Sequence, residues 1–417
     1  MSRWNHVTDA PPDPILAVGV AFNADPAENK VNLGIGAYRD ENGKPWVLSC
    51  IKQAEAQISA DLNAGKINKE YLPMQGLQAF LDKTSEVILG KASPAIKEKR
   101  VAVVQSLSGT GALRLCAEFL AQYNPGVTVY VSDPTWGNHH AIFKKAGLNT
   151  KTYRYLTPNM GLDFAGMCAD LEAAKEGDVF VFHTVAHNPT GVDPTQEQWK
   201  KLADITEAKK AVPVFDTAYQ GYASGDLEKD AFSVRYFAHD RGMELMVTQS
   251  YSKNFGLYGE RIGALNVVTK DPEAAIKIRG QLNMSTRAMI SNPPLHGARL
   301  VAAVLSDPTL CGMWEKELKI MSDRIVTMRT SLIEALKANG CPTPSTVFAD
   351  WSHITSQIGM FAYTGLQAKH VDLLASKFHI YCTKNGRFSM AGINPGNVKY
   401  IADAMKDVLA TAGPSDS

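Results

Sequence analysis

Lys253 has neighbours that suit it to act as a nucleophile. It lies in the run Ser250-Tyr251-Ser252-Lys253-Asn254-Phe255-Gly256, directly after an apolar segment. A neutral lysine amine can form a Schiff base with a carbonyl group. Most lysines are solvated surface residues, so this interpretation depends on the groups that the fold would place beside Lys253.

A second motif is suited to binding phosphate. Ser108-Gly109-Thr110-Gly111 follows another apolar run and begins a helical pattern, so it offers backbone N–H groups, hydroxyls and a helix dipole. Considered alone, a helix N-cap beside a glycine turn explains these residues equally well. Neither nucleotide-binding motif fits. Gly111 precedes Ala112 rather than lysine, and Gly34-Ile35-Gly36-Ala37-Tyr38-Arg39 lacks the third glycine of a dinucleotide loop.

The elements that position these motifs alternate along the middle of the chain. Apolar runs at 101–106, 127–131, 179–182, 212–215, 245–249 and 263–268 are separated by helical stretches such as 112–122 and 195–210. This alternation predicts an α/β fold with a mainly parallel sheet covered by helices. In such sheets ligands bind beyond the carboxyl ends of the strands. The segments expected to meet there are Ser108 to Gly111, Asp133 to Trp136, His187 to Gly191, Asp216 to Tyr219, and Ser250 to Lys253.

The predicted cluster contains the groups that pyridoxal phosphate requires of its protein. Lys253 supplies an amine, and the segment from Ser108 to Gly111 supplies a phosphate site. Asp216 ends the apolar run Val214-Phe215-Asp216 and offers a carboxylate that can pair with a pyridinium nitrogen. This conjunction favours an enzyme that uses pyridoxal phosphate.

The histidines raise the alternative of a metal site. His183 and His187 are four residues apart, and His139 is adjacent to His140. If the run that begins at 179 continues as a strand, His183 and His187 lie on one face but about 13 Å apart, too far to share an ion. We therefore expect no metal and predict that these histidines form hydrogen bonds beneath a cofactor.

Composition limits the partners. The chain has 417 residues with a net charge of +1, so no overall field attracts nucleic acid or an anionic membrane. Six scattered cysteines show no metal-ligand spacing and indicate reduced thiols in an intracellular protein. The N-terminus lacks an apolar signal core, and no apolar run approaches the roughly 20 residues of a membrane span. A charged substrate must therefore be bound by individual side chains.

A long helix is predicted over 308–339. Asp307-Pro308 is a good N-cap and first-turn pair, and apolar residues recur at helical spacing from Trp314 to Leu336, before Asn339-Gly340. We expect this helix to link a large domain, residues 46–310, to a small domain formed by residues 1–45 and 311–417.

Seven ordered motifs extend over nearly the whole chain and are specific enough to indicate a family. They are Asn32-Leu33-Gly34-Ile35-Gly36-Ala37-Tyr38-Arg39, Glu70-Tyr71-Leu72-Pro73, Ser108-Gly109-Thr110-Gly111-Ala112-Leu113-Arg114, His187-Asn188-Pro189-Thr190-Gly191, Tyr219-Gln220-Gly221, Ser252-Lys253-Asn254-Phe255-Gly256-Leu257-Tyr258-Gly259-Glu260-Arg261 and Ser291-Asn292-Pro293-Pro294. Together they resemble the aspartate aminotransferases of the class I pyridoxal-phosphate-dependent family. The resemblance implies the type I fold, with a small α+β domain beside the large one, and a homodimer whose active sites lie at the interface.

The resemblance also assigns roles by motif. Lys253, Asp216, Tyr219 and Trp136 are the implied catalytic residues. The implied phosphate ligands are Ser108, Gly109, Thr110, Ser250, Arg261 and Tyr71 of the partner subunit. The implied ring contacts are Trp136, Asn188, Tyr219 and Asp216, with His139 supporting Asp216. The implied substrate contacts are Gly36, Trp136, Asn188, Arg387 for the α-carboxylate, and Arg287 of the partner subunit for the distal carboxylate.

The implied reaction is ping-pong transfer of the amino group from L-aspartate to 2-oxoglutarate through a Lys253 Schiff base, giving oxaloacetate and L-glutamate. Ala288 and Ile290 stand where the family often has proline and tyrosine, so a related aminotransferase with a broader, aromatic range is the alternative. A lyase or decarboxylase with the same cofactor would not need two arginines for a dicarboxylate. Motifs near the N-terminus and Trp136 resemble mitochondrial members, and the expected compartment is the cytoplasm or the mitochondrial matrix.

Overall fold

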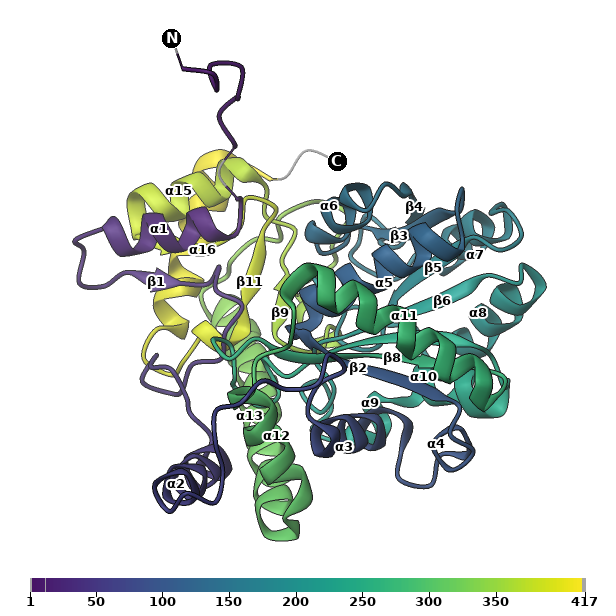
Figure 1. Cartoon of the computed structure of the whole chain (residues 1–417). Helices are drawn as coiled ribbons and strands as arrows, with labels where there is room; N and C mark the ends of the chain where they lie inside the picture. The colour runs from purple at the N-terminus through teal and green to yellow at the C-terminus, as the bar shows by residue number, and fades with distance from the viewer. Residues whose placement is uncertain (1, 12, 415–417) are drawn as a thin grey trace.

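The computed structural model describes residues 2–11 and 13–414, so Met1, Pro12 and residues 415–417 of the predicted small domain lie outside the described residues. Among the described residues, a central sheet of seven strands occupies the larger part of the molecule (Figure 1). In sheet order the strands are β2 (Val101–Leu107), β8 (Ile262–Val268), β7 (Leu245–Ser250), β6 (Val212–Thr217), β5 (Val179–His183), β3 (Thr128–Asp133) and β4 (Asn149–Arg154). Neighbouring strands are parallel except at β8, which is antiparallel to both β2 and β7. The predicted mainly parallel sheet is confirmed.

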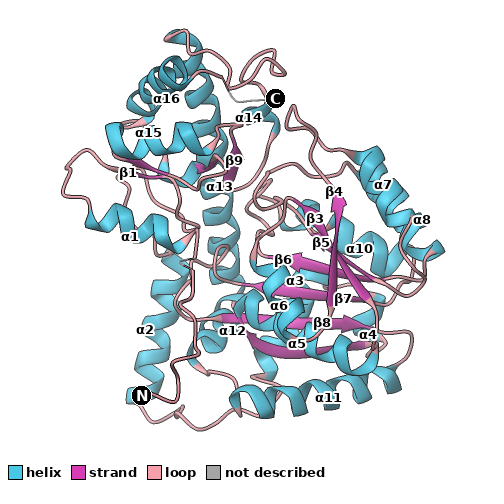
Figure 2. Ribbon diagram, turned by 90° about the horizontal axis from the view of Figure 1, so that it is seen from above, coloured by secondary structure: helices cyan, strands magenta, loops and turns pink. Residues whose placement is uncertain are grey.

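Helices cover both faces of this sheet (Figure 2). In β5, Phe180 and Phe182 pack on one face, and Val179 and Val181 pack on the other, because successive side chains of a strand alternate. The valine face is covered by α5 (Ser108–Tyr123), α6 (Asn138–Lys145) and α11 (Pro272–Ile290). The phenylalanine face is covered by α3 (Gln78–Leu89), α4 (Pro94–Lys97), α7 (Phe164–Glu172), α8 (Gln196–Ala208), α10 (Phe232–Arg235) and the π-helix η1 (Tyr236–Asp240).

Strand β4 was not predicted from the sequence. Its residues, Asn-Thr-Lys-Thr-Tyr-Arg, are mostly polar, and Tyr153 is the buried member of the strand. β4 lies at the edge of the sheet, where one side of the strand and much of its surface face water. A strand at the edge can therefore be mostly polar. A polar strand gives no hydrophobic pattern in the sequence, so it was not predicted.

The long helix α13 (Pro308–Ala338) ends one residue before the predicted range does. The Asp307 side chain caps it by accepting hydrogen bonds from the N–H groups of Thr309 and Leu310, at 2.7 and 3.1 Å. Its buried stripe packs against elements from both ends of the chain. No helix among residues 2–11 and 13–414 combines the length and apolar character needed to cross a membrane.

A second group of elements gathers beside α13, away from the large sheet (Figure 1). β1 (Val31–Asn32) pairs in parallel with β10 (Ile380–Tyr381), and β9 (Phe361–Tyr363) pairs antiparallel with β11 (Arg387–Ser389), so that Tyr363 opposes Arg387. The other elements of this group are α1 (Leu16–Ala24), α14 (His353–Ser356), α15 (Ala368–Phe378), the 3-10 helix η2 (Met390–Gly392) and α16 (Val398–Ala412). Three further helices lie outside this group: α2 (Ser49–Asn63) and α12 (His296–Ser306) pack against each other and against α13, and α9 (Leu227–Asp230) packs against α10. This arrangement brings Arg387, from the C-terminal part of the chain, toward the sheet.

Candidate active site

The carboxyl ends of β2, β5, β6 and β7 open into one pocket of about 230 Å³. All five segments expected to meet at this edge contribute a residue to the pocket or pack directly behind it. The lining residues are Ser108, Gly109, Thr110, Trp136, His183, Asn188, Asp216, Ala218, Tyr219, Ser250, Ser252, Lys253 and Arg261. The pocket therefore gathers an amine, a carboxylate, hydroxyls, a guanidinium and two aromatic side chains.

Three serine hydroxyls form one wall of the pocket. Ser108 Oγ lies 2.8 Å from both Ser250 Oγ and Ser252 Oγ, at the first residue of α5. A Cβ at Gly109 would stand 3.1 Å from Ser250 Cβ, so the backbone can approach this closely because residue 109 is glycine. Arg261 donates to Ser252 Oγ at 3.4 Å. Hydroxyls, a helix N-terminus and a guanidinium together suit an anion such as a phosphate group.

Asp216 lines the pocket, and His139 lies behind it. Asp216 Oδ2 is 3.1 Å from His139 Nε2, and Thr135 Oγ1 is 2.8 Å from His139 Nδ1. Burial acts to raise the pKa of Asp216, but the hydrogen bond from His139 and the nearby charges, including that of Lys253, together outweigh it, so the pKa is lowered. Asp216 is therefore kept as an anion with its other oxygen near Thr248 Oγ1, at 3.4 Å.

Lys253 places its amine among these groups. Its Nζ atom lies 5.1 Å from the centre of the Tyr219 ring. Burial lowers the pKa of Lys253 to about 8, while the Asp216 carboxylate opposes this shift and the charges of Arg261 and Arg387 add to it. Burial also raises the pKa of Tyr219, so its hydroxyl keeps its proton at neutral pH. A substantial fraction of Lys253 is neutral near pH 7 to 8, the form in which an amine acts as nucleophile or base.

Arg387 reaches the same region from β11. Its guanidinium donates to Asn188 Oδ1 at 3.2 Å and to the Gly34 carbonyl oxygen at 3.0 Å, and it stacks on Phe361 at 4.1 Å. Arg387 is 3% exposed, and burial lowers the pKa of its side chain. Gly36 also lies beside Phe361, since an added Cβ would be 3.8 Å from Cζ of its ring. A buried cation beside a pocket favours an anionic ligand.

Five predicted site residues are not among those that line this pocket: His139, Gly36 and Arg387, which lie near it, and Tyr71 and Arg287. Tyr71 is 87% exposed, and Arg287, in the last turn of α11, is also exposed. Arg287 donates a hydrogen bond to Ser291 Oγ. The resemblance predicts that both residues act on the pocket of a partner subunit, and this expectation remains a prediction.

The predicted separation of His183 and His187 is wrong. Their ring centres are 4.2 Å apart, not about 13 Å, because β5 ends at His183 and the chain turns at Ala186, which has a φ of 53°. Asp193 holds this turn by accepting hydrogen bonds from the N–H groups of Ala186 and His187, at 2.6 and 2.9 Å. Burial raises the pKa of Asp193 to about 6. The turn also presents the next residue, Asn188, to the pocket.

Because these histidines lie close together, a metal site must be considered again. One ligand atom each of His139, His183 and Asp216 lies within 4.8 Å of the others, a group that could hold a metal ion. Burial lowers the pKa of His183 well below its usual value, so the ring is neutral. His139 already bonds Asp216 directly, and we assign the group to support of Asp216. The absence of a metal remains a prediction.

Ala218 and three further residues at or near the pocket were not predicted as site residues. Ser252 was considered only as a neighbour of Lys253. Its position among other hydroxyl-bearing residues could have indicated that it belongs to the site. His183 was predicted to form hydrogen bonds, but its Nε2 atom has no hydrogen-bond partner among the described residues. Phe361, which contacts both Arg387 and Tyr219, belongs to no motif that reasoning from residue types could have used.

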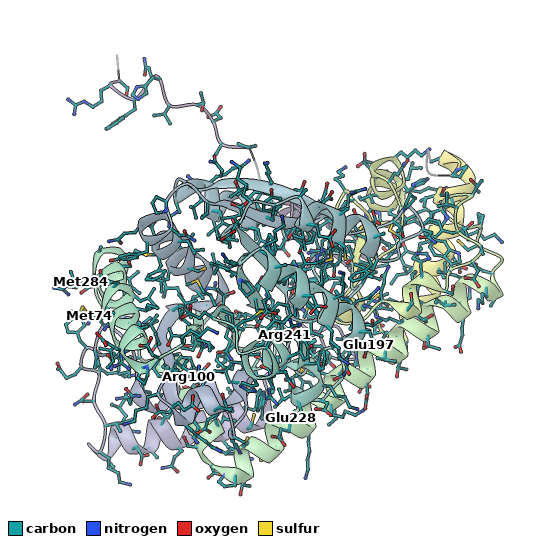
Figure 3. The ribbon with its side chains drawn as sticks, turned by 90° about the vertical axis from the view of Figure 1, so that its right-hand side faces the viewer. Met74, Arg100, Glu197, Glu228, Arg241 and Met284 are labelled. Atoms are coloured by element: carbon teal, nitrogen blue, oxygen red, sulfur yellow. The ribbon has the colours of Figure 1, made fainter. Side chains whose placement is uncertain are left out.

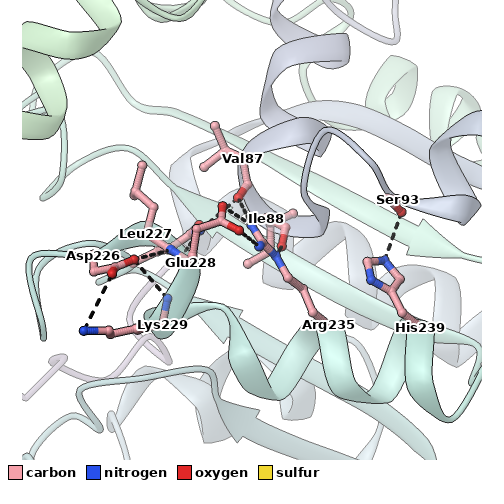
Figure 4. Close-up of polar contacts among 10 residues, drawn as sticks. Val87, Ile88, Ser93, Asp226, Leu227, Glu228, Lys229, Arg235 and His239 are labelled. Carbon is pink, nitrogen blue, oxygen red and sulfur yellow. Dashed lines mark hydrogen bonds and ion pairs between the residues drawn. The ribbon is translucent and has the colours of Figure 1, made fainter.

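A larger cavity, of about 520 Å³, lies beside the C-terminal end of α3. There Arg235 donates hydrogen bonds to the carbonyl oxygens of Val87 and Ile88 and pairs with Glu228 of α9 (Figure 4). Ser93 Oγ lies 2.9 Å from His239 Nε2 in the same region. These polar groups satisfy one another and the end of a helix, so we assign them to the stability of the turn after α3.

Comparison with known proteins agrees with the fold and the pocket. Residues 28–405 match the family model described as aminotransferase class I and II. The mitochondrial aspartate aminotransferase of Arabidopsis thaliana is 50% identical over 412 residues, which cover 99% of this chain and 93% of the relative. The cytoplasmic aspartate aminotransferase of Giardia lamblia has a TM-score of 0.96 at 42% identity, with each chain covered completely. The aromatic-amino-acid aminotransferase of Burkholderia pseudomallei, covalently bound to pyridoxal phosphate, has a TM-score of 0.92 at 42% identity, covering 98% of this chain and 100% of the other.

These likenesses extend over the whole sheet and the elements around α13, and they include the pocket-forming segments. The predicted fold class and family are confirmed. The chain belongs to the aminotransferase class I and II family.

Proposed function

We propose that this chain is an aspartate aminotransferase that uses pyridoxal phosphate to move an amino group between L-aspartate and 2-oxoglutarate. The observation that carries the proposal is the pocket in which the Lys253 amine, the Asp216 carboxylate and the three serine hydroxyls converge. The high identity to aspartate aminotransferases from plant and protist supports the choice of substrate.

The residues present fit the cofactor. Ser108, Ser250 and Arg261 would hold its phosphate group beside the N-terminus of α5. Asp216, kept ionised by His139, would hold a proton on the ring nitrogen. Asn188 and Tyr219, both lining the pocket, would donate to the phenolic oxygen, and Trp136 would cover the ring. When bound, the cofactor supplies an electron sink that allows the bond between Cα and its hydrogen to break.

Lys253 would move the proton. With a pKa of about 8, its amine is basic enough to accept the Cα proton and acidic enough, once protonated, to return it to an adjacent carbon. Tyr219 lies beneath the amine and limits the directions in which Nζ can move. General acid–base catalysis by one positioned group typically contributes about 10²- to 10⁴-fold.

The substrate would be held at both ends. Arg387 can bind the α-carboxylate through two parallel hydrogen bonds, and its burial strengthens that attraction. Trp136 and Asn188 line the adjoining pocket, and Gly36 would contact the substrate from beside Phe361, the ring on which Arg387 stacks. Arg287 of the partner subunit would bind the distal carboxylate, which distinguishes aspartate and glutamate from other amino acids.

A homodimer with shared active sites follows from this assignment. Large apolar side chains are exposed on α11, which carries Arg287, and at Tyr71. In the view of Figure 3, Met74 and Met284 both lie at the left-hand edge of the molecule. The exposed fractions are 87% for Tyr71, 61% for Ile276, 61% for Met284 and 42% for Met289. Exposed apolar surface of this kind is typical of an interface.

The assignment extends to domain boundaries and compartment. We infer a large domain at residues 46–310 and a small domain at residues 1–45 and 311–417, joined by α13. Arg387 and Gly34, which share a hydrogen bond, both belong to the second group of elements, and Arg387 also donates to Asn188 of the pocket. Related enzymes come from both cytoplasm and mitochondria, and either compartment would suit this chain.

Steady-state kinetics test the proposed function. Initial rates with varied aspartate and 2-oxoglutarate should give parallel double-reciprocal lines, as ping-pong transfer requires. The value of kcat/KM for aspartate should exceed that for phenylalanine at least about 100-fold, because the site must leave a guanidinium unpaired when the distal carboxylate is missing. Similar values for the two amino acids would favour the broader aminotransferase, to which Ala288 and Ile290 point. Intersecting lines would exclude the mechanism.

A further inference from the structure

The chain makes a strained turn directly after Arg287. Ser291 has φ 65° and ψ −65°, and the N–H of Asn292 donates to the carbonyl oxygen of Ile290 at 2.8 Å. These values define a γ-turn with positive φ, a rare conformation that serine adopts only at an energetic cost. The cost is tolerated only where the surroundings hold the turn in place.

One hydrogen bond attaches this turn to the segment that carries Tyr71, and two others link the side chains within the turn. Ser291 Oγ accepts from Arg287 and donates to Asn292 Oδ1 at 2.9 Å. The Asn292 amide in turn donates to the carbonyl oxygen of Leu72 at 2.7 Å. The direction of the Arg287 guanidinium therefore depends on where the segment at 72–77 lies.

Gln105 fixes both segments to the sheet. This residue of β2 is completely buried, and its Nε2 donates to the carbonyl oxygen of Pro294 at 2.6 Å. Its Oε1 accepts from the N–H of Leu77 at 3.2 Å, and its own N–H donates to the carbonyl oxygen of Gln75 at 2.8 Å. β2 is an edge strand, so its outer N–H groups are free to bind a loop.

The packing around this amide leaves little freedom. Gly76 has a φ of 113°, and a Cβ there would stand 2.4 Å from Gln105 Cβ and 2.7 Å from its Oε1. The loop therefore rests directly on the Gln105 side chain, and only glycine fits at the contact. Pro293 and Pro294 follow the Ser291 turn, and their φ angles are fixed by their rings. The hydrogen bond from Gln105 to the Pro294 carbonyl therefore also restricts the position of the Ser291 turn.

We propose that Gln105 is a positioning residue for recognition of the distal carboxylate: its buried amide fixes the Ser291 turn and thereby the direction of Arg287. The inference rests on the proposed function, in which Arg287 binds that carboxylate across the subunit interface. Gln105 itself lies three residues before Ser108, so one strand holds both the phosphate site of its own subunit and the arginine presented to the other.

The test compares two substrates in Gln105→Met. Methionine keeps the length of the side chain but cannot donate to the Pro294 carbonyl or accept from Leu77. A misplacement of 1 Å can cost about 100-fold, so kcat/KM for aspartate should fall roughly 10- to 100-fold, mainly through KM. The value for phenylalanine, which has no distal carboxylate, should stay within about threefold of the parent. Inhibition by succinate should weaken in parallel.

A matched control separates positioning from general stability. Asn266, on the neighbouring β8, is also a completely buried amide; it donates to Gln249 Oε1 at 2.6 Å and accepts from Ser85 Oγ at 2.7 Å. Asn266→Leu should lower Tm but leave the ratio of the two kcat/KM values unchanged. Gln105→Asn, which keeps an amide too short to reach Pro294, provides a second variant if Gln105→Met does not fold.

The outcomes are distinguishable. A selective loss on aspartate in Gln105→Met or Gln105→Asn supports the proposal. An equal loss on both substrates, or an unchanged ratio, overturns it while leaving the proposed function intact. A parent enzyme that does not transaminate aspartate overturns the proposed function and this inference with it.

Discussion

Asp216 and His139 form a buried pair in which the carboxylate Oδ2 lies 3.1 Å from the imidazole Nε2. β6 carries Asp216 to the floor of the pocket, and α6 supplies His139 from behind it. The His139 hydrogen bond lowers the pKa of Asp216 even though burial acts in the opposite direction. The pair thus keeps a negative charge ready where the cofactor's ring nitrogen would lie.

Asp216→Asn should remove that charge while preserving the shape of the side chain. We expect kcat for aspartate to fall by at least about 100-fold, while KM changes by only a few-fold, because the lost interaction acts mainly in the transition state. His139→Asn, which leaves the carboxylate in place, should have a smaller effect. A kcat for Asp216→Asn within a few-fold of the parent would show that ring protonation has another source.

Lys253 should titrate well below an ordinary lysine. In cofactor-free protein, labelling of its amine by fluorodinitrobenzene should increase with pH with a midpoint near pH 8, because only the neutral amine reacts. Asp216→Asn should move the midpoint lower still, since the carboxylate is the group that raises the Lys253 pKa. Peptide mass spectrometry gives the rate for each lysine. A midpoint near 10 would contradict the lowered pKa.

Mixing of subunits tests whether Arg287 acts across an interface. Arg287→Ala should lower kcat/KM for aspartate by roughly 30-fold to several thousand-fold, from a loss of about 2 to 5 kcal/mol. Lys253→Ala should be nearly inactive because its proton carrier is missing. A heterodimer of the two variants should recover activity, since one of its sites keeps both residues. If mixing restores nothing, Arg287 acts within its own chain.

Most strands of the large sheet could be predicted from the hydrophobicity of the sequence alone. β5, with Val179 to His183 buried throughout, reads as a strand because both of its faces are covered. The direction of β8 could not be predicted from the sequence, because a buried apolar run has the same pattern in a parallel and in an antiparallel strand. β4 was missed for the opposite reason: it lies at the polar edge.

Some features of the site can likewise be predicted from the sequence, and others cannot. Lys253 and Asp216 follow apolar runs, so the rule that ligands bind beyond strand ends brings them together. The 4.2 Å contact of His183 and His187 depends on a turn with positive φ at Ala186. Alanine rarely adopts a positive φ, so its presence in the sequence does not predict such a turn. Gln105 was hidden inside an apolar run, and its partners, Leu77 and Pro294, are far away in the sequence.

A single-turnover half-reaction tests the central claim most directly. Purified protein loaded with pyridoxal phosphate is mixed with aspartate alone, and oxaloacetate is measured with malate dehydrogenase and NADH. The proposed amino transfer predicts about one oxaloacetate per subunit, then no more until 2-oxoglutarate is added, when glutamate forms and turnover resumes. Lys253→Ala should give no burst on the same time scale. Continued release of product without a keto acid, or no oxaloacetate at all, would contradict the assignment.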